Sequence, residues 1–129
     1  MIKVTAAIIL KGNKFLIAKR KNGKWEFPGG RVEKGESYEE CLKREIREEL
    51  DIHINILKSF TIVSRGNIEL HTYIAICKDE PVAKEHEELK WISIGEADNY
   101  EFMPPDKKII RELDEKWSEI IQLSKTYTQ

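Results

Sequence analysis

The chain has 129 residues, of which 40% are hydrophobic and 35% charged, so it suits one domain with one core and excludes a disordered chain. Its 22 basic and 23 acidic residues give a net charge of −1, so we expect no binding to duplex nucleic acid and no attachment to a membrane. The apolar run at 6–10 is too short for a membrane span or a secretory leader, which makes the cytoplasm the expected compartment. We therefore expect a single domain over 1–129, as a monomer or homodimer, that binds a small molecule.

The first part of the chain has the pattern of extended strands. Residues 3–10 are almost continuously apolar, and residues 15–18 resume that pattern after the dipeptide Gly12-Asn13. Gly and Asn in a two-residue connection favour a β-hairpin. A basic, polar loop (19–24) and a short extended piece (25–27) follow.

The strongest helix signal lies in the segment that begins at Ser37. Ser37 suits the N-cap position, and Glu40, three residues later, completes a capping box. The run from 38 to 50 contains no Gly, Pro or Val, so we expect one uninterrupted helix that ends near Leu50.

The rest of the chain contains three strand patterns and a long final helix. Residues 52–63 and 68–77 are predicted as strands joined by a turn, and residues 89–94 as a further strand. Apolar residues at helical spacing predict a helix over 105–123, followed by a polar, frayed tail from 124 onward. Strands and helices do not alternate strictly, so we expect an α+β fold with a mixed sheet rather than a doubly wound one.

An acidic cluster lies beside the apolar stripe of the predicted helix. At about 100° per residue, Glu45, Glu48 and Glu49 share one arc of the helix surface. The adjoining arc carries the residues expected to face the core, which are Leu42, Ile46 and Leu50. Like charges at these spacings repel, and a helix C-terminus disfavours anions, so local stability does not account for the cluster. One explanation is a solvated acidic face, and the other is a hard divalent cation, Mg²⁺ or Mn²⁺.

The acidic cluster belongs to a longer motif. Five residues separate Gly30 from Glu36, and seven more lead to Arg-Glu-Ile-Arg-Glu-Glu-Leu-Asp-Ile at 44–52. This resembles the Nudix box, GX5EX7REUXEEXGU with U a bulky aliphatic residue, at every specified position except Asp51, where the box has glycine. The stretch 25–31 also resembles the MutT branch of that family, and the order of elements fits along most of the chain.

The resemblance implies a Nudix-type α/β/α sandwich with a mixed β-sheet and a catalytic loop–helix–loop that holds Mg²⁺. It implies that Glu45, Glu48 and Glu49 are metal ligands, joined by the carbonyl of Gly29. These four are therefore the expected metal site within the box.

Two other parts of the box have structural roles by the same resemblance. Glu36 and Arg44 would pair and brace the loop against the helix, which suits the bidentate geometry of a guanidinium on a carboxylate. Asp51 replaces the glycine that supplies a left-handed residue after the helix, and Asp tolerates that conformation better than most residues. We expect a small loss of stability there and intact chemistry.

Outside the box, the segment 83–91 resembles the one that supplies a further metal-site glutamate in MutT-like enzymes. Glu85 is our choice, Glu87 and Glu88 compete with it, and a solvated acidic loop is the alternative. Arg20, at the end of the second strand, matches a residue that touches substrate phosphates in the family, and its alternative is an ordinary surface charge.

Two residues are candidates for contact with a base. Phe27 precedes the Pro-Gly-Gly loop, and a place in the core is its alternative role. The stretch 100–106 resembles the base-recognition segment of MutT-like and CTP-type pyrophosphohydrolases, where Asp106 would read the base. An ionised carboxylate only accepts hydrogen bonds, which suits the amine of cytosine or the N1–H and amine of guanine. An N-cap or first-turn position on the last helix is its alternative role, and both roles can hold together.

The resemblance implies a Mg²⁺-dependent hydrolase that converts a nucleoside triphosphate, of the 8-oxo-dGTP, dGTP, CTP or dCTP type, to monophosphate and pyrophosphate. The general base stays open among Glu45, Glu48, Glu49 and Glu85. The proline that marks ADP-ribose pyrophosphatases is absent, since Asn67 stands there, and so is the tyrosine of diadenosine polyphosphate hydrolases. The alternatives are another Nudix diphosphatase, acting on a sugar nucleotide, a dinucleotide polyphosphate or an RNA cap, and a non-catalytic nucleotide sensor.

The remaining reactive residue types show no pattern of a site. Cys41 and Cys77 lie far apart without a CxxC partner, so we expect two buried thiols. His53, His71 and His86 lack HxxxH spacing and are expected to be ordinary strand or loop residues rather than ligands.

Overall fold

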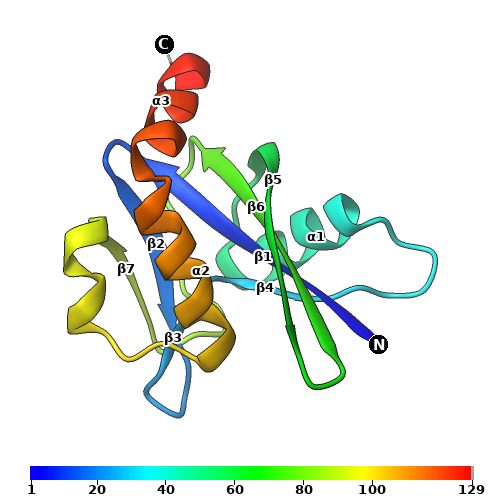
Figure 1. The fold of residues 1–129 in the computed structure, drawn as a ribbon. Helices are drawn as coiled ribbons and strands as arrows, with labels where there is room; N and C mark the ends of the chain where they lie inside the picture. Colours follow the sequence, from blue (N-terminus) through cyan, green and yellow to red (C-terminus); the bar gives the residue numbers. More distant parts are fainter. Residues whose placement is uncertain (129) are drawn as a thin grey trace.

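The computed structural model describes residues 1–128, in which all strands join one sheet (Figure 1). The strands are β1 (Ile2–Lys11), β2 (Lys14–Lys19), β3 (Trp25–Glu26), β4 (Gly29–Arg31), β5 (Ile54–Arg65), β6 (Ile68–Cys77) and β7 (Glu88–Ile92). The path runs β3-β2-β1-β6-β5, with β4 attached to β1 and β7 to β2. Strand β1 is parallel to β6, while the other pairs are antiparallel, so the sheet is mixed as predicted.

Helices cover both faces of this sheet. They are α1 (Tyr38–Leu50), the 3₁₀ helix η1 (Ile94–Asn99), α2 (Pro104–Glu115) and α3 (Trp117–Thr128). Helix α1 lies on one face, and α2 and α3 lie on the other (Figure 1). This is the α/β/α arrangement expected for the chain. Within residues 1–128, no helix has the length and apolar character needed to cross a membrane.

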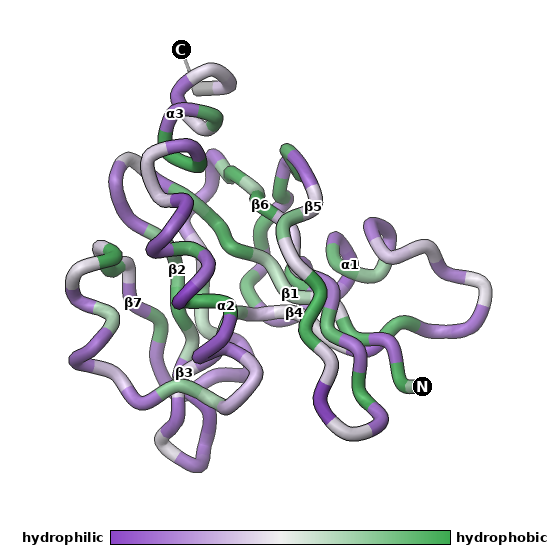
Figure 2. The backbone as a smooth tube through the Cα atoms, viewed as in Figure 1, coloured by the Kyte–Doolittle hydropathy of each residue, from purple (hydrophilic) through white to green (hydrophobic). Residues whose placement is uncertain are grey.

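Strand β1 is central because its side chains contribute to the apolar cores on both faces of the sheet. Side chains alternate between the two faces of a strand, and Ile9 packs with Ile46 of α1 while Ile8 packs with Ile109 of α2. A strand buried on both faces needs apolar residues at successive positions, which explains the continuous apolar run in the sequence. Figure 2 shows this concentration of apolar residues along β1 and β2 and the polar character of the loops at the ends of the sheet.

Helix α1 begins and ends as the sequence predicts. The Glu40 N–H donates to Ser37 Oγ at 3.1 Å, and the Ser37 N–H donates to the Glu40 carboxylate at 2.9 Å, so the capping box is present. After Leu50, the backbone of Asp51 takes the left-handed conformation, with φ 56° and ψ 38°. The acidic residue therefore occupies the position of the family glycine without lengthening the helix.

The last helix differs from the prediction, since it is two helices. At Lys116 the backbone leaves the helical region, with φ −109°, and its N–H bonds to the carbonyls of Glu112 and Asp114. The apolar face continues across the break through Leu113 and Ile120, so periodicity alone indicates one helix. The tail predicted to fray from 124 is helical through 128, because Ser124 is buried against the sheet side of α3.

The observed strand boundaries also differ from the predicted ones. The strand expected at 89–94 is β7, which ends at Ile92, and η1 follows it. A second capping box starts η1, in which the Ser93 N–H donates to Glu96 at 2.9 Å. The Ser-x-x-Glu spacing was present in the sequence and predicts this helix start. Strand β5 extends two residues further than expected, to Arg65.

Candidate active site

Two glycines allow the loop before α1 to lie against its neighbours. A Cβ on Gly29 would lie 2.0 Å from the carbonyl oxygen of Thr5, and a Cβ on Gly30 would lie 2.3 Å from Cδ of Glu45. Any larger residue would displace the backbone of β1 or the acidic side chain. The Thr5 hydroxyl donates to the Gly30 carbonyl at 3.2 Å, which fixes the loop on the sheet.

The carbonyl of Gly29 faces away from β1. The Ala7 N–H donates to the Pro28 carbonyl at 2.8 Å, and the Val32 N–H donates to the Lys3 carbonyl at 2.9 Å. In an antiparallel pair, the residues between such hydrogen-bonded positions point their polar groups to the other side. Gly29 lies opposite Ala6 at such a position, so its carbonyl is free for the ligand role predicted for it.

Arg44 connects the loop to α1. Its Nε and Nη2 donate to the two oxygens of Glu36, at 2.6 and 3.0 Å, in the bidentate arrangement that was predicted. Nη2 also donates to the Arg31 carbonyl at 3.3 Å. These bonds from Arg44, together with the Glu33 N–H, lower the pKa of Glu36 to about 2, so the pair stays ionised.

The three glutamates of the predicted arc differ in exposure. The side chain of Glu48 is 53% exposed, that of Glu45 is 19% exposed, and that of Glu49 is 5% exposed. Arg44 Nη1 donates to Glu45 at 2.8 Å and lies 3.3 Å from Glu48, so one guanidinium balances both. Arg44 makes no such contact with Glu49, within the part of the chain that the structure describes.

Glu49 is the least compensated carboxyl group of the site. Its Oε2 is buried without a hydrogen-bond partner among the described residues. Burial raises the pKa of Glu49, the charges of Glu45, Glu26 and Glu85 act in the same direction, and together they bring it to about 9. The tertiary structure therefore gathers four carboxyl groups that repel one another.

The donor set fits a hard divalent cation. Among residues 1–128, no three His, Cys, Asp or Glu side chains form a ready-made metal cage. The buried, unpartnered oxygen of Glu49 and the repulsion from its neighbours are nevertheless the two features that a bound cation would relieve. Oxygen donors of this kind suit Mg²⁺ or Mn²⁺ rather than Zn²⁺.

A cavity of about 500 Å³, which we call the acidic pocket, lies beside this cluster. Its walls include Arg20, Glu26, Glu49, Glu85 and His86. Neither of the two competitors of Glu85 lines this pocket. The Glu88 carboxylate lies 3.8 Å from Lys90, and Glu87 uses its backbone N–H to bond the Lys19 carbonyl.

Four members of the acidic pocket were missed by the sequence analysis: Lys21, Asn22, Glu26 and His86. His86 is a loop residue, as expected, but its side chain is only 6% exposed and its Nε2 lies 3.0 Å from Glu26 and 3.7 Å from Glu49. Glu26 stands between the buried aromatic residues Trp25 and Phe27. That alternation indicates that Glu26 faces the opposite side from them, but nothing in the sequence indicates which residues it meets there.

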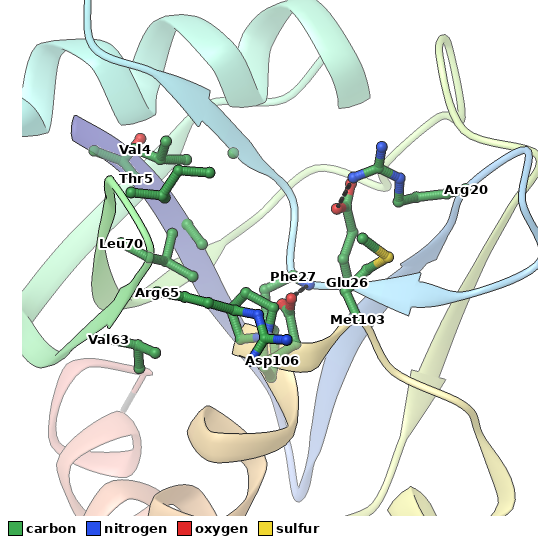
Figure 3. A pocket seen from close by; sticks show the side chains of 14 residues that line it. Val4, Thr5, Arg20, Glu26, Phe27, Val63, Arg65, Leu70, Met103 and Asp106 are labelled. Atoms are coloured by element: carbon green, nitrogen blue, oxygen red, sulfur yellow. Dashed lines mark hydrogen bonds and ion pairs between the residues drawn. The ribbon is translucent and has the colours of Figure 1, made fainter. Parts of the chain in front are cut away.

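A second cavity, which we call the apolar pocket, has a volume of about 210 Å³ (Figure 3). Its walls include Phe27, Val63, Arg65, Leu70, Met103 and Asp106. Asp106 lies in the first turn of α2, is 5% exposed, and accepts the Phe27 N–H at 2.9 Å. Burial raises its pKa to about 7, although the Phe27 N–H acts in the opposite direction.

Phe27 has the core role that the sequence left open as its alternative, and it also lines the apolar pocket. It is 3% exposed, and its ring centroid lies 5.7 Å from that of Phe15 and 6.4 Å from that of Phe102. The ring is therefore part of the core and one wall of the apolar pocket at once.

Arg20 and Glu26 form the wall that the two pockets share. Both residues line the acidic pocket and the apolar pocket, and Arg20 Nη1 donates to Glu26 at 3.2 Å, as drawn in Figure 3. The Arg20 side chain is 47% exposed, so its other donors face solvent. A molecule that spans the two pockets would pass directly over this guanidinium.

Comparison with known proteins agrees with this geometry. A model of the NUDIX domain matches residues 1–113. The chain belongs to the Nudix family. Members of this hydrolase family act with divalent cations, and in this chain Glu26, Glu49 and Glu85 line the acidic pocket.

Relatives of this Nudix hydrolase carry names of nucleotide-cleaving enzymes. It is similar to a CTP pyrophosphohydrolase of Escherichia coli (strain K12), 39% identical over 116 residues, which cover 82% of this chain and 86% of that protein. It is also similar to an 8-oxo-dGTP diphosphatase of Buchnera aphidicola, 30% identical over 118 residues, which cover 85% and 91%. Both relatives match over nearly the whole chain.

Solved structures confirm the Nudix fold. The solution structure of the E. coli ORF135 protein superposes with a TM-score of 0.79, at 32% identity, over 92% of both chains. A MutT structure from work on Aliivibrio salmonicida and Vibrio cholerae superposes with a TM-score of 0.79, at 28% identity, over 94% of this chain and 97% of that one.

Proposed function

We propose that this Nudix hydrolase cleaves a nucleoside triphosphate to the nucleoside monophosphate and pyrophosphate, with Mg²⁺ as its cation. The observation that supports this proposal most strongly is the wall that the two pockets share, formed by Arg20 and Glu26. The apolar pocket suits a base, the acidic pocket suits cation-bound phosphates, and Arg20 lies between them. The relatives named CTP pyrophosphohydrolase and 8-oxo-dGTP diphosphatase support the same class of substrate.

In this proposal the acidic residues hold the cation. Glu45, Glu48, Glu49 and Glu85 are the carboxylate ligands, together with the Gly29 carbonyl. A divalent cation held there supplies charge neutralisation for the phosphate oxygens. Mn²⁺ has the same donor preference and is the expected substitute.

The other residues position the substrate and move a proton. The Arg20 guanidinium attracts the phosphates by charge and can donate to their oxygens. Water attacks phosphorus, the bond to the leaving phosphate oxygen breaks, and one glutamate accepts the proton of the water. The general base stays open among Glu45, Glu48, Glu49 and Glu85.

The apolar pocket selects the base in this proposal. Oδ1 of Asp106 is occupied by the Phe27 N–H, which leaves Oδ2 for the exocyclic amine of cytosine or guanine. Figure 3 shows Arg65 reaching into the same pocket, where its guanidinium can donate to a keto oxygen of the base. Bases with both an amine and a keto group, which are cytosine and guanine types, therefore fit better than thymine or uracil.

The test is product analysis with a panel of nucleotides and Mg²⁺: CTP, dCTP, 5-methyl-dCTP, dGTP, 8-oxo-dGTP, UTP, ADP-ribose and diadenosine tetraphosphate. We expect a triphosphate of cytosine or guanine type to yield monophosphate and pyrophosphate. Glu48→Gln should lower the turnover at least about a hundredfold, because a lost cation ligand removes several kcal/mol of transition-state stabilisation. Arg47→Gln, an exposed change on the same helix, is the matched control.

Two outcomes would contradict the proposal. Cleavage of ADP-ribose or the dinucleotide alone would place the chain among the other Nudix diphosphatases. Nucleotide binding without any turnover would favour the non-catalytic sensor. The cytoplasmic location and the monomeric or homodimeric state stay predictions of the sequence.

A further inference from the structure

A line of four polar side chains joins the shared wall to the buried end of the cation site. Arg20 Nη1 lies 3.2 Å from Glu26 Oε1, Glu26 Oε2 lies 3.0 Å from His86 Nε2, and the same Nε2 lies 3.7 Å from Glu49 Oε1. The four side chains come from four segments: the end of β2, strand β3, the loop before β7, and α1. His86 is the member that connects two carboxylates.

Burial increases along this line toward Glu49. The exposed fraction of the side chain is 47% at Arg20, 21% at Glu26, 6% at His86 and 5% at Glu49. Charge-assisted contacts are stronger where water is excluded, so the buried half of the line is the more rigid half. The histidine therefore lies where its contacts have the greatest effect on side-chain position.

The hydrogen-bonding roles of the two ring nitrogens differ. Nε2 lies 3.0 Å from a carboxylate oxygen of Glu26, which can only accept, so Nε2 is the donor of this bond. Nδ1 is buried and has no hydrogen-bond partner among the described residues. The orientation of the ring is thus fixed through the bond to Glu26, which leaves Nε2 3.7 Å from Glu49.

The loop that carries His86 is anchored on both sides of the ring. The Val82 N–H donates to the Leu50 carbonyl at 2.9 Å and the Lys84 N–H to the Glu49 carbonyl at 3.0 Å, which fix the loop to the end of α1. The Glu87 N–H donates to the Lys19 carbonyl at 2.9 Å, which fixes it to β2. The backbone on either side of His86 therefore keeps a constant distance to the elements it bridges.

We propose that His86 is a positioning residue: its Nε2–H holds Glu26 by a hydrogen bond and its ring lies between Glu26 and Glu49, so that it keeps the phosphate-binding Arg20 aligned with the cation-binding carboxylates. Without this donor, Glu26 would lose its nearest buried partner and its side chain would be free to move relative to Glu49. Glu49 would then lose the neighbour that fixes its position toward the cation, and Glu26 would no longer hold Arg20 in place. The proposal rests on the proposed function for the part that concerns phosphates.

The test compares two substitutions of nearly equal bulk. His86→Gln retains an amide N–H that can reach the position of Nε2, whereas His86→Leu retains volume without a donor. The first readout is Mn²⁺ binding to the protein alone, by calorimetry. We expect His86→Leu to weaken Mn²⁺ binding about 10- to 100-fold, as for other residues that orient metal ligands, and His86→Gln to stay within about threefold of the wild type.

His71→Leu is the matched control. His71 is also largely buried and also contacts a glutamate, with its Nε2 at 2.6 Å from Glu69, but it lines neither the acidic nor the apolar pocket. It should lower thermal stability while leaving Mn²⁺ binding unchanged. A loss of Mn²⁺ affinity in this control equal to that of His86→Leu would mean that general destabilisation, and not positioning, weakens the site.

The second readout is steady-state kinetics with the nucleotide that the panel identifies. We expect His86→Leu to raise KM for the nucleotide several-fold, through Arg20, in addition to lowering kcat, with partial rescue in His86→Gln. Mn²⁺ binding equal to wild type in His86→Leu would overturn the proposal, and so would a His86→Gln variant as weak as His86→Leu. If the wild type turns over no nucleotide, the proposed function fails, and the Mn²⁺ comparison alone decides the role of His86.

Discussion

Two buried carboxyl groups, Glu49 in the acidic pocket and Asp106 in the apolar pocket, lie on opposite sides of the Arg20–Glu26 wall. Burial is the largest cause of the raised pKa in both, to about 9 for Glu49 and about 7 for Asp106. The next influences differ. Other carboxylates push the pKa of Glu49 higher, whereas the Phe27 N–H pulls that of Asp106 down.

The difference indicates what each pocket takes as a ligand. An acid surrounded by other acids becomes an anion only when a cation compensates the cluster, which agrees with the role of cation ligand that we propose for Glu49. An acid surrounded by apolar groups and held by one backbone N–H is divided between its two protonation states near neutral pH, so Asp106 suits a neutral, hydrogen-bonding ligand such as a base. The same residue class thus has two uses, set by its neighbours.

The largest expected effect comes from replacing Glu49, the buried carboxyl group of the acidic pocket. We expect Glu49→Gln to lower kcat/KM at least about a hundredfold, because a cation ligand is lost. The same change should stabilise the metal-free protein at pH 8. The folded state binds a proton at Glu49 between its ordinary pKa near 4.5 and about 9, so the wild-type carboxyl lowers stability increasingly as pH rises through that range.

Thermal unfolding with EDTA and with Mg²⁺ measures both parts of this prediction. The melting temperature of Glu49→Gln should exceed that of the wild type by a few degrees in EDTA, since about 1 kcal/mol moves Tm by roughly 4 °C in a domain of this size. Its rise in Tm on adding Mg²⁺ should be smaller than that of the wild type. An undiminished rise with Mg²⁺ would remove Glu49 from the cation site.

An intermediate effect is expected from replacing Asp106, the buried carboxyl group of the apolar pocket. Asp106→Asn keeps an acceptor for the Phe27 N–H but cannot ionise. Because the folded pKa of Asp106 is about 7 against an ordinary value near 3.8, the wild type loses stability as pH rises from about 4 to 7. We expect the variant to exceed the wild type by roughly 1–3 kcal/mol at pH 8 and by much less at pH 5, as measured by urea unfolding.

The control for this pH dependence is Asp114→Asn, which changes an exposed aspartate on the same helix. It should shift stability equally at both pH values. A difference between pH 5 and pH 8 that is no larger for Asp106 than for Asp114 would show that the buried carboxyl ionises normally, and the contrast with Glu49 would then be one of degree only.

The smallest effect is expected from replacing Asp51, which lines neither pocket, so both pockets should stay unchanged. Asp51 is the one non-glycine residue with positive φ among the described residues, and a left-handed conformation costs a residue with a Cβ about 1 kcal/mol. Asp51→Gly should therefore raise the free energy of unfolding by roughly 0.5–1 kcal/mol, offset in part by loss of the contact with Arg47 at 3.6 Å. A changed turnover in this variant would show that the end of α1 controls where Glu49 points.

Local signals predicted the elements better than their ends. The continuous apolar run of β1, the turn at Gly12 and the capping box at Ser37 each involve residues a few positions apart, and the structure has all three. The break at Lys116 was missed because the apolar face of the helix continues through it. The spacing of apolar residues indicates which side of a segment is buried, but it does not indicate whether the backbone stays helical throughout.

For the site, too, relations between residues close in the chain were predicted, whereas contacts between distant segments were not. Spacing on one helix placed Glu45, Glu48 and Glu49 on one arc, and the motif supplied the pairing of Glu36 with Arg44, which the structure shows as a bidentate bond. Glu26 and His86 lie 60 positions apart in the chain, and no local pattern relates them. Their contact exists only because β3 and the loop before β7 both pack beside β2.

By itself the sequence determined the acidic arc, because helix geometry relates residues three, four or seven positions apart in a fixed way. Its resemblance to the Nudix box indicated the family and the left-handed residue after α1. The tertiary structure alone decided that Glu49 is 5% exposed while Glu48 is 53% exposed. It also decided that Arg20 and Glu26 separate a pocket of acids from a pocket of apolar side chains. Desolvation and charge interactions depend on distances between segments far apart in the chain, and packing on the sheet sets those distances.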